Sequence, residues 1–166
     1  MSFDLLEQSL FGLSFREGVW LFPIAFMVHV LEELPRFADW ARRHASKRFT
    51  LNDYLRVHCA GLIVSPMSAG AIWLFPNSWT VLLFFALVFA PAVFFNSLFH
   101  AGATLHSGAY CPGLFTAIVL YLPLFYILCR LALREGLLSN STMIVGLLIA
   151  GVFHAVEVGH NLYKAW

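Results

Sequence analysis

Five long apolar stretches, separated by short polar breaks, dominate the sequence. Each is close to the roughly 20 residues that an α-helix needs to cross the hydrocarbon core of a bilayer. The breaks are rich in Gly, Pro, Asn and Ser, which favour turns, or in basic residues. The pattern predicts an all-α fold, a polytopic membrane helix bundle of about five transmembrane helices, over residues 17–35, 54–75, 79–105, 112–134 and 141–163.

The chain before the first stretch predicts a different kind of helix. Phe3, Leu6, Leu10 and Leu13 recur at helical spacing among polar residues, and the stretch lacks the basic region and cleavage site of a secretory signal. We therefore expect a retained, short amphipathic helix that turns these side chains toward lipid. No internal repeat or linker divides the sequence, so we expect a single domain over residues 1–166.

Composition supports a membrane protein and excludes other classes. Hydrophobic residues make up 60% of the chain and charged residues 11%, with a mean hydropathy of +0.78. A water-soluble domain could not bury so much apolar surface. The net charge of +1 gives no reason to expect a nucleic acid partner. Cys59, Cys111 and Cys129 form no CxxC pair, so neither a disulfide framework nor a thiolate zinc site is indicated.

The distribution of basic residues predicts an orientation. Most of them lie between the first two apolar stretches, and the positive-inside rule places such a segment in the cytoplasm. We therefore expect an integral membrane protein with this segment in the cytoplasm. Arg130 and Arg134 fall on the opposite side, as a minor exception. The basic residues of the cytoplasmic segment are Arg36, Arg42, Arg43, Lys47, Arg48 and Arg56.

Polar side chains gather near the same ends of three apolar stretches. The first, third and fifth stretches run in one direction, so their last thirds lie at one depth, on the cytoplasmic side. Acidic residues inside a membrane are costly, at about 2.5–3.5 kcal/mol each, and point to function by default. The residues concerned are His29, Glu32 and Glu33, then Asn96 and His100, then His154, Glu157 and His160.

Spacing within each stretch supports convergence of these side chains. His29 and Glu33 are four residues apart, as are Asn96 and His100, so each pair shares a helix face. Farther along, the sequence reads Glu-x-x-His at residues 157–160, the spacing found in helix-bundle di-iron carboxylate sites.

The run His29-Val30-Leu31-Glu32-Glu33 resembles the motif that gives the HXXEE family of small prokaryotic membrane proteins its name. Asn96-x-x-x-His100 and the stretch from His154 to His160 extend the resemblance over nearly the whole chain. The resemblance implies a small helical protein of a prokaryotic inner membrane and says little about its mechanism.

A looser likeness exists to intramembrane CAAX-type proteases, which combine a Glu-Glu helix carrying a downstream Arg with later His helices. In that likeness, the corresponding residues would be Glu32, Glu33, Arg36, His100 and His154. The sequence departs from it in three places. The Arg comes one residue early, Asn96 stands for an expected Phe, and Val158 stands for an expected Asn or Asp.

The leading hypothesis is an intramembrane metal-dependent enzyme that acts on a lipid or lipophilic small molecule. Mixed imidazole and carboxylate ligation suits iron or zinc, with oxidation expected for iron and hydrolysis for zinc. One ion or a pair would be bound, shared above all by His29, Glu33, His100 and His154. Glu32, Glu33 and His100 are the candidate catalytic residues. The full candidate metal-ligand set is His29, Glu32, Glu33, His100, His154, Glu157 and His160.

Three alternatives use the same residues differently. In a metal-free hydrolase, Glu32 or Glu33 would act as general base while His100 or His154 steadies an oxyanion. In a proton-coupled transporter, the His and Glu side chains would relay protons. A plain membrane scaffold would have to carry the cost of so many buried polar groups.

Overall fold

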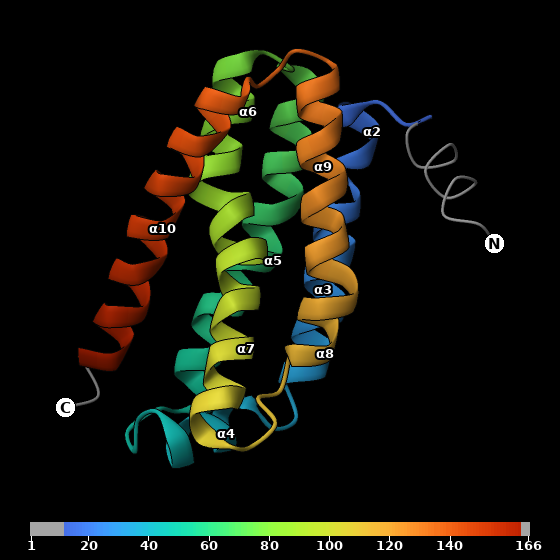
Figure 1. Ribbon diagram of the computed structural model, residues 1–166. Helices are drawn as coiled ribbons and strands as arrows, with labels where there is room; N and C mark the ends of the chain where they lie inside the picture. Colours follow the sequence, from blue (N-terminus) through green and yellow to red (C-terminus); the bar gives the residue numbers. More distant parts are fainter. Residues whose placement is uncertain (1–11, 164–166) are drawn as a thin grey trace, which may run out of the picture.

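The computed structural model describes residues 12–163, and of residues 161–163 the backbone alone. All regular structure in that part of the chain is helical, arranged as a bundle (Figure 1). Of the predicted N-terminal amphipathic helix, Phe3, Leu6 and Leu10 lie outside the described residues, and Leu13 lies in a non-helical segment.

Four helical spans in the described part are long and apolar enough to cross a membrane: Leu51–Leu74, Ser78–Ser107, Leu114–Arg134 and Asn140–His160. Their bounds lie within a few residues of those predicted from the sequence. A fifth span is present if Phe15–Glu33 and Phe37–His44, which meet at a bend of 65°, are counted as one broken span. The membrane helix bundle is therefore confirmed, with the first predicted span as its least regular member.

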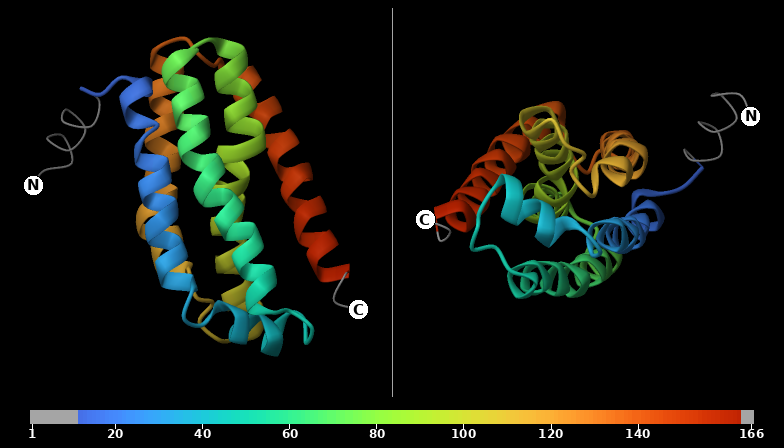
Figure 2. Two further views of the ribbon diagram at one scale, coloured as in Figure 1. Left: turned by 180° about the vertical axis from the view of Figure 1, so that it is seen from behind. Right: turned by 90° about the horizontal axis from the view of Figure 1, so that it is seen from below.

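That first span consists of α2 (Phe15–Gly18) and α3 (Leu21–Glu33), followed by α4 (Phe37–His44). Pro35 falls in the break between α3 and α4, where it cannot continue the helical hydrogen bonds. The chain therefore turns directly after Glu33, and α4 lies across the end of the bundle (Figure 2). Trp40 and Ala41 of α4 are buried against the bundle, whereas Arg42 and Arg43 are exposed.

The remaining helices begin and end at local signals in the sequence. Thr50 and Asp53 form a capping box at the start of α5 (Leu51–Leu74), and Asn77 caps α6 (Ser78–Phe84). The same span continues through π-helical segments η1 (Phe85–Phe89) and η2 (Pro91–Phe95) into α7 (Asn96–Ser107). Gly108, with a φ of 64°, ends α7 in the left-handed conformation.

A loop leads from α7 into α8 (Leu114–Thr116), η3 (Ala117–Tyr121) and α9 (Leu122–Arg134), and α10 (Asn140–Tyr163) closes the fold. Two of the π-helical segments adjoin polar residues, since η2 ends beside Asn96 and η3 begins after Thr116. Such segments often occur at functional sites, because they change which face of a helix a side chain occupies.

Candidate metal centre

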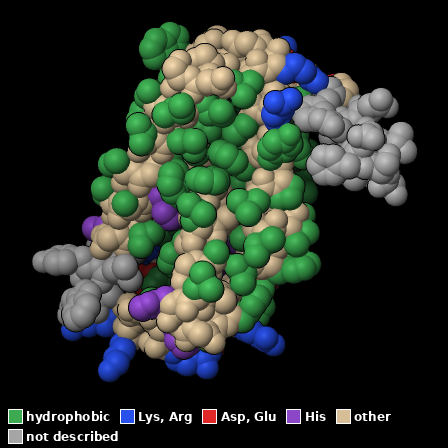
Figure 3. Space-filling model, viewed as in Figure 1, with side chains coloured by type: hydrophobic (Ala, Val, Ile, Leu, Met, Phe, Trp, Pro, Cys, Tyr) green, Lys and Arg blue, Asp and Glu red, His purple; other side chains and the backbone are tan. Residues whose placement is uncertain are grey.

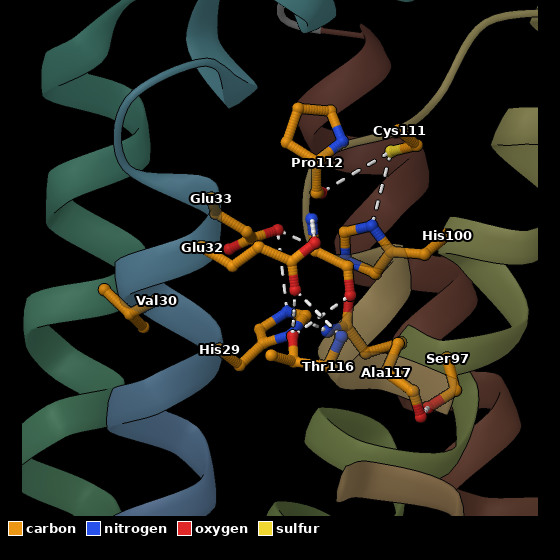
Figure 4. A network of polar contacts seen from close by, with 12 residues as sticks. His29, Val30, Glu32, Glu33, Ser97, His100, Cys111, Pro112, Thr116 and Ala117 are labelled. Atoms are coloured by element: carbon orange, nitrogen blue, oxygen red, sulfur yellow. Dashed lines mark hydrogen bonds and ion pairs between the residues drawn. The ribbon is translucent and has the colours of Figure 1, made fainter. Parts of the chain in front are cut away.

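Glu33, at the C-terminal end of α3, is the centre of a buried polar cluster. Its side chain is only 2% exposed, and imidazoles from three helices surround it. Nε2 of His29 lies 3.6 Å and Nε2 of His100 3.2 Å from one oxygen, Oε1. Each of His29, Glu33 and His100 offers a ligand atom within 4.8 Å of the other two, and all three side chains are buried (Figure 4).

The other oxygen of Glu33, Oε2, is held from α5. Nε2 of His58 lies 2.8 Å away, and the hydroxyl of Tyr54 lies 3.3 Å away. Nδ1 of His58 is 2.8 Å from the backbone carbonyl of Tyr54, which fixes the orientation of the ring. With Oε2 occupied in this way, Oε1 is the oxygen that faces His29 and His100.

The hydrogen-bond network assigns the proton on His29 to Nδ1. Oγ1 of Thr116 lies 2.5 Å from Oε2 of Glu32, a nearer and stronger acceptor than the Gly113 carbonyl at 3.2 Å, so the hydroxyl donates to Glu32. Its oxygen must then accept from Nδ1 of His29, at 2.8 Å. The lone pair of His29 is left on Nε2, where the Asn96 amide donates to it at 3.0 Å.

His100 presents the same nitrogen to the cluster. Its Nδ1 lies 3.3 Å from Sγ of Cys111, whose thiol is directed at the Pro112 carbonyl at 3.8 Å. Burial raises the pKa of Cys111 to about 12, with Glu33 adding to the shift, so the sulfur beside Nδ1 is a neutral thiol. Nε2 of His100 is buried and has no hydrogen-bond partner among the described residues. This nitrogen faces Oε1 of Glu33.

Glu32, although next to Glu33, is used differently. Its carboxylate accepts from the backbone N–H groups of Gly113, Phe115 and Thr116 at 3.0, 3.3 and 2.8 Å, and from the hydroxyls of Tyr110 and Thr116. Burial and the bond to Glu32 raise the pKa of Tyr110. Glu32 thus fastens the loop after α7 to α3, rather than joining the three facing side chains (Figure 4).

Gly113 shows how closely this loop covers the cluster. A Cβ atom at this position would lie 2.6 Å from Cε1 of His100, 2.9 Å from Cε1 of His29 and 3.0 Å from Cγ of Glu33. Its φ of 99° is also one that favours glycine. The loop backbone can therefore close over the three side chains only because residue 113 has no side chain.

A cavity of about 470 Å³ borders the cluster. His29 and Glu33 line it on one side, and His154 and Glu157 of α10 line it as well. Nε2 of His154 is buried without a hydrogen-bond partner in the described part of the chain, and its ring stacks on Phe95 with the centroids 6.1 Å apart. Of the predicted ligands, these two lie around the cavity and outside the compact group of three.

His160 lies one turn farther along α10 and is exposed. The structure thus brings together His29, Glu33 and His100 as sequence spacing predicted, with Glu32 turned to the loop. His154 does not share this site closely. The group whose ligand atoms lie within 4.8 Å of one another contains only the other three predicted partners.

Several site residues were not singled out from the sequence. The residues concerned are Tyr54, His58, Cys111, Gly113 and Thr116. A single Thr or Gly inside or beside an apolar helix is ordinary in membrane proteins, so its sequence position does not distinguish it. Asn96 was recognised as a helix-face partner of His100, yet its amide bonds His29 instead.

Comparison with known proteins identifies a family. A family model described as "Protein of unknown function with HXXEE motif" matches residues 20–128. The match spans more than half of the chain, contains every residue of the cluster and its loop, and ends before α10. Neither a curated protein nor a solved structure matches the chain. The motif of this family is the run His29-Val30-Leu31-Glu32-Glu33 described above, and the chain belongs to the HXXEE family.

Proposed function

We propose that this protein is an intramembrane metalloenzyme that holds one divalent ion between Nε2 of His29, Nε2 of His100 and the carboxylate of Glu33. The observation that carries the proposal is that two imidazole nitrogens and a carboxylate oxygen face one another in a buried site. A divalent ion among these three atoms would offset the cost of burying the carboxylate.

The separations of these atoms fit an ion. Ligand atoms about 2.1 Å from a tetrahedrally coordinated zinc ion lie roughly 3.4 Å from one another. The two separations from Oε1 of Glu33 are 3.2 and 3.6 Å, on either side of that value. The contacts of Nδ1 of each histidine, with Thr116 and with Cys111, are of the kind that orients metal-binding imidazoles.

The ligand set favours one ion over a pair. Among the described residues, His29, Glu33 and His100 form the one group of three or more His, Cys, Asp or Glu side chains close enough to hold an ion. Two histidines and one carboxylate serve both hydrolytic zinc and non-haem iron(II), and both leave coordination positions open. Those positions would face the cavity, because His29 and Glu33 line it.

Of the two reactions, the surroundings favour hydrolysis. A bound zinc ion would supply an activated water at neutral pH. Glu157 lines the same cavity and is the carboxylate best placed to act as general base, while the amide of Asn96 and the ring of His154 can bind a substrate carbonyl. The apolar walls select a lipophilic ester or amide.

The site is proposed to face the cytoplasm. The cluster lies at the end of the bundle covered by α4, where Arg42, Arg43, Lys47 and Arg48 are exposed. The positive-inside rule then gives that end a cytoplasmic position.

Elemental analysis of protein purified without added metal tests the proposal. We expect about one equivalent of a divalent ion, and none in His29→Ala, Glu33→Gln or His100→Ala. His160→Ala is the matched control, because this histidine is exposed and outside the group, and it should retain the ion. Zinc would support hydrolysis and iron would support oxidation. Wild-type protein that contains no ion and binds none on addition would contradict the proposal.

A further inference from the structure

The cavity beside the cluster has two chemically different ends. Near α4 it is lined by His58, Asn96 and Glu157, which bear hydrogen-bonding groups. One to two helical turns farther into the bundle, the lining is apolar and includes Val64 and Val88. A volume of about 470 Å³ lies within the range of small-molecule sites. The cavity thus suits an amphiphile with its polar group beside the cluster.

The end of the cavity that faces the aqueous phase is covered. Trp40, Ser46 and Phe49 of α4 and the loop after it contribute to the lining, and Trp40 and Ser46 are buried. The chain bends directly after Glu33, which places this cover against the site. A ligand from the aqueous side would have to displace it.

The side of the cavity along α10 is less enclosed. The first half of α10 packs on η1, and Gly151 lies against Phe95. Toward its C-terminal end α10 leans away from α7 (Figure 1), and the surface is hollowed there (Figure 3). Val152 and Val156 of that half are more than 60% exposed, as expected of a helix in contact with lipid. The hollow therefore lies beside a helix whose outer face is exposed as lipid-facing helices are.

The charges of the lining restrict the polar group of the ligand. Carboxylates of Glu33, Asp53 and Glu157 line the cavity, whereas no Lys or Arg occurs among its described lining residues. Binding of a phosphate or sulfate normally relies on Arg or Lys. Hydrogen-bonding groups such as the Asn96 amide instead suit a hydroxyl or carbonyl.

We propose that the cavity binds a single-chain amphiphile with an uncharged polar head, which enters from the bilayer beside the C-terminal half of α10. The chain occupies the apolar end along Val64 and Val88, and the head lies among Asn96, His58 and Glu157. This assignment rests on the proposed function for the chemistry at the head. Binding itself needs only the cavity.

The test uses photolabelling of the full chain in phosphatidylcholine vesicles. Three probes carry the same diazirine in a hexadecyl chain and differ in the head: hexadecanol, hexadecyl phosphate and hexadecyltrimethylammonium. We expect hexadecanol to label cavity-lining residues of α5 and α10, and excess unlabelled hexadecanol to compete. The two charged probes should give about tenfold less competable labelling. Equal labelling by all three heads, or strongest labelling by a charged one, would overturn the proposal.

A matched pair of variants on α5 tests the location. Val64 and its neighbour Ile63 are both exposed, but Val64 lines the cavity and Ile63 lies outside the lining. Val64→Trp should abolish competable labelling by hexadecanol, whereas Ile63→Trp should leave it unchanged. Labelling unaffected by Val64→Trp would contradict the location. If Val64→Trp fails to fold, as judged by circular dichroism, labelling of the wild-type protein by the three probes still tests the proposal.

Metal content separates this inference from the proposed function. If the wild-type protein shows competable labelling but contains no ion, the metalloenzyme is refuted and the lipid site is upheld. Wild-type protein with the ion but without competable labelling would refute the lipid site alone.

Discussion

Nε2 of His100 lies 3.2 Å from Oε1 of Glu33, and no hydrogen bond satisfies this buried nitrogen within the described part of the chain. The two atoms belong to different helices, α7 and α3, so the contact holds two membrane spans in register around a polar centre. Because Nδ1 of His100 is engaged by Cys111, the ring cannot relieve the contact by exchanging its nitrogens without losing that bond.

A bound ion should stabilise the fold through this contact. We expect wild-type protein with zinc at 1,000 times its dissociation constant to gain about 4 kcal/mol in the free energy of unfolding over chelator-treated protein. Thermal unfolding in detergent, followed by circular dichroism, measures the shift. Glu33→Gln should unfold at the same temperature with and without zinc. A zinc-dependent shift of wild-type size in that variant would place the ion elsewhere.

The hydroxyl of Thr116 should control the affinity for the ion. It accepts from Nδ1 of His29 and donates to Glu32, so it fixes which nitrogen of His29 carries the lone pair. Thr116→Val keeps the shape of the side chain but removes both bonds, and we expect about 10–100-fold weaker zinc binding. Thr116→Ser keeps the hydroxyl and should bind nearly as wild type. Competition with a fluorescent zinc chelator gives both constants, and equal affinity of the two variants would refute this role.

The sequence contains enough information for the spans and for the core of the cluster. Apolar length located the spans, and the i, i+4 spacing of His29 and Glu33 placed both on one face. Because the first and third spans run in the same direction, His100 of α7 is then predicted to lie near these two side chains. These inferences depend on local geometry and on chain direction, which a sequence specifies directly.

The remaining parts of the site depend on packing between distant segments. Adjacent residues on a helix point about 100° apart, so Glu32 and Glu33 could not face the same target. Both lie about one turn from His29, so spacing alone does not determine which of them joins the cluster. The sequence predicts how deep in the membrane His154 lies. It does not predict the tilt of α10, which keeps the side chain of His154 outside the group of three. The bend after Glu33 was unexpected, because the predicted first span continued to residue 35.

Glu32 and Glu33 should give different defects. Glu32 binds the loop from Tyr110 to Thr116 and lies outside the facing group. Glu32→Gln weakens charge-assisted hydrogen bonds, and we expect a loss of about 1.5–3 kcal/mol in the free energy of unfolding while the ion is retained. Glu33→Gln should lose the ion. Unfolding and metal content measured on both variants test this, and loss of the ion in both would contradict separate roles.

The orientation of the protein can be tested with single cysteines. Lys47 is exposed in the loop after α4, and Ser78 is exposed at the start of α6, at the opposite end of the bundle. Cys59 is exposed, so a Cys59→Ser background is needed. We expect a membrane-impermeant maleimide to label Ser78→Cys in intact cells and Lys47→Cys only after lysis. The reverse labelling pattern would show that the site lies on the outer side of the membrane.

Gly113 provides the sharpest test of the packing around the centre. Gly113 and Gly108 both have positive φ values, 99° and 64°, so alanine at either position strains the backbone by about 1–3 kcal/mol. They differ in surroundings: a Cβ at 113 would meet His100, His29 and Glu33 within 3.0 Å, and a Cβ at 108 meets nothing within 4 Å.

Gly113→Ala must therefore push the loop off the cluster or displace the two imidazoles. We expect it to lower zinc affinity at least about tenfold, the range typical of losing an orienting contact, while Gly108→Ala binds as wild type. Measuring unfolding and zinc affinity on both variants separates backbone strain from displacement of the ligands. Equal losses of zinc affinity would mean that strain alone acts, and unchanged affinity in Gly113→Ala would show that the loop does not cover the ion.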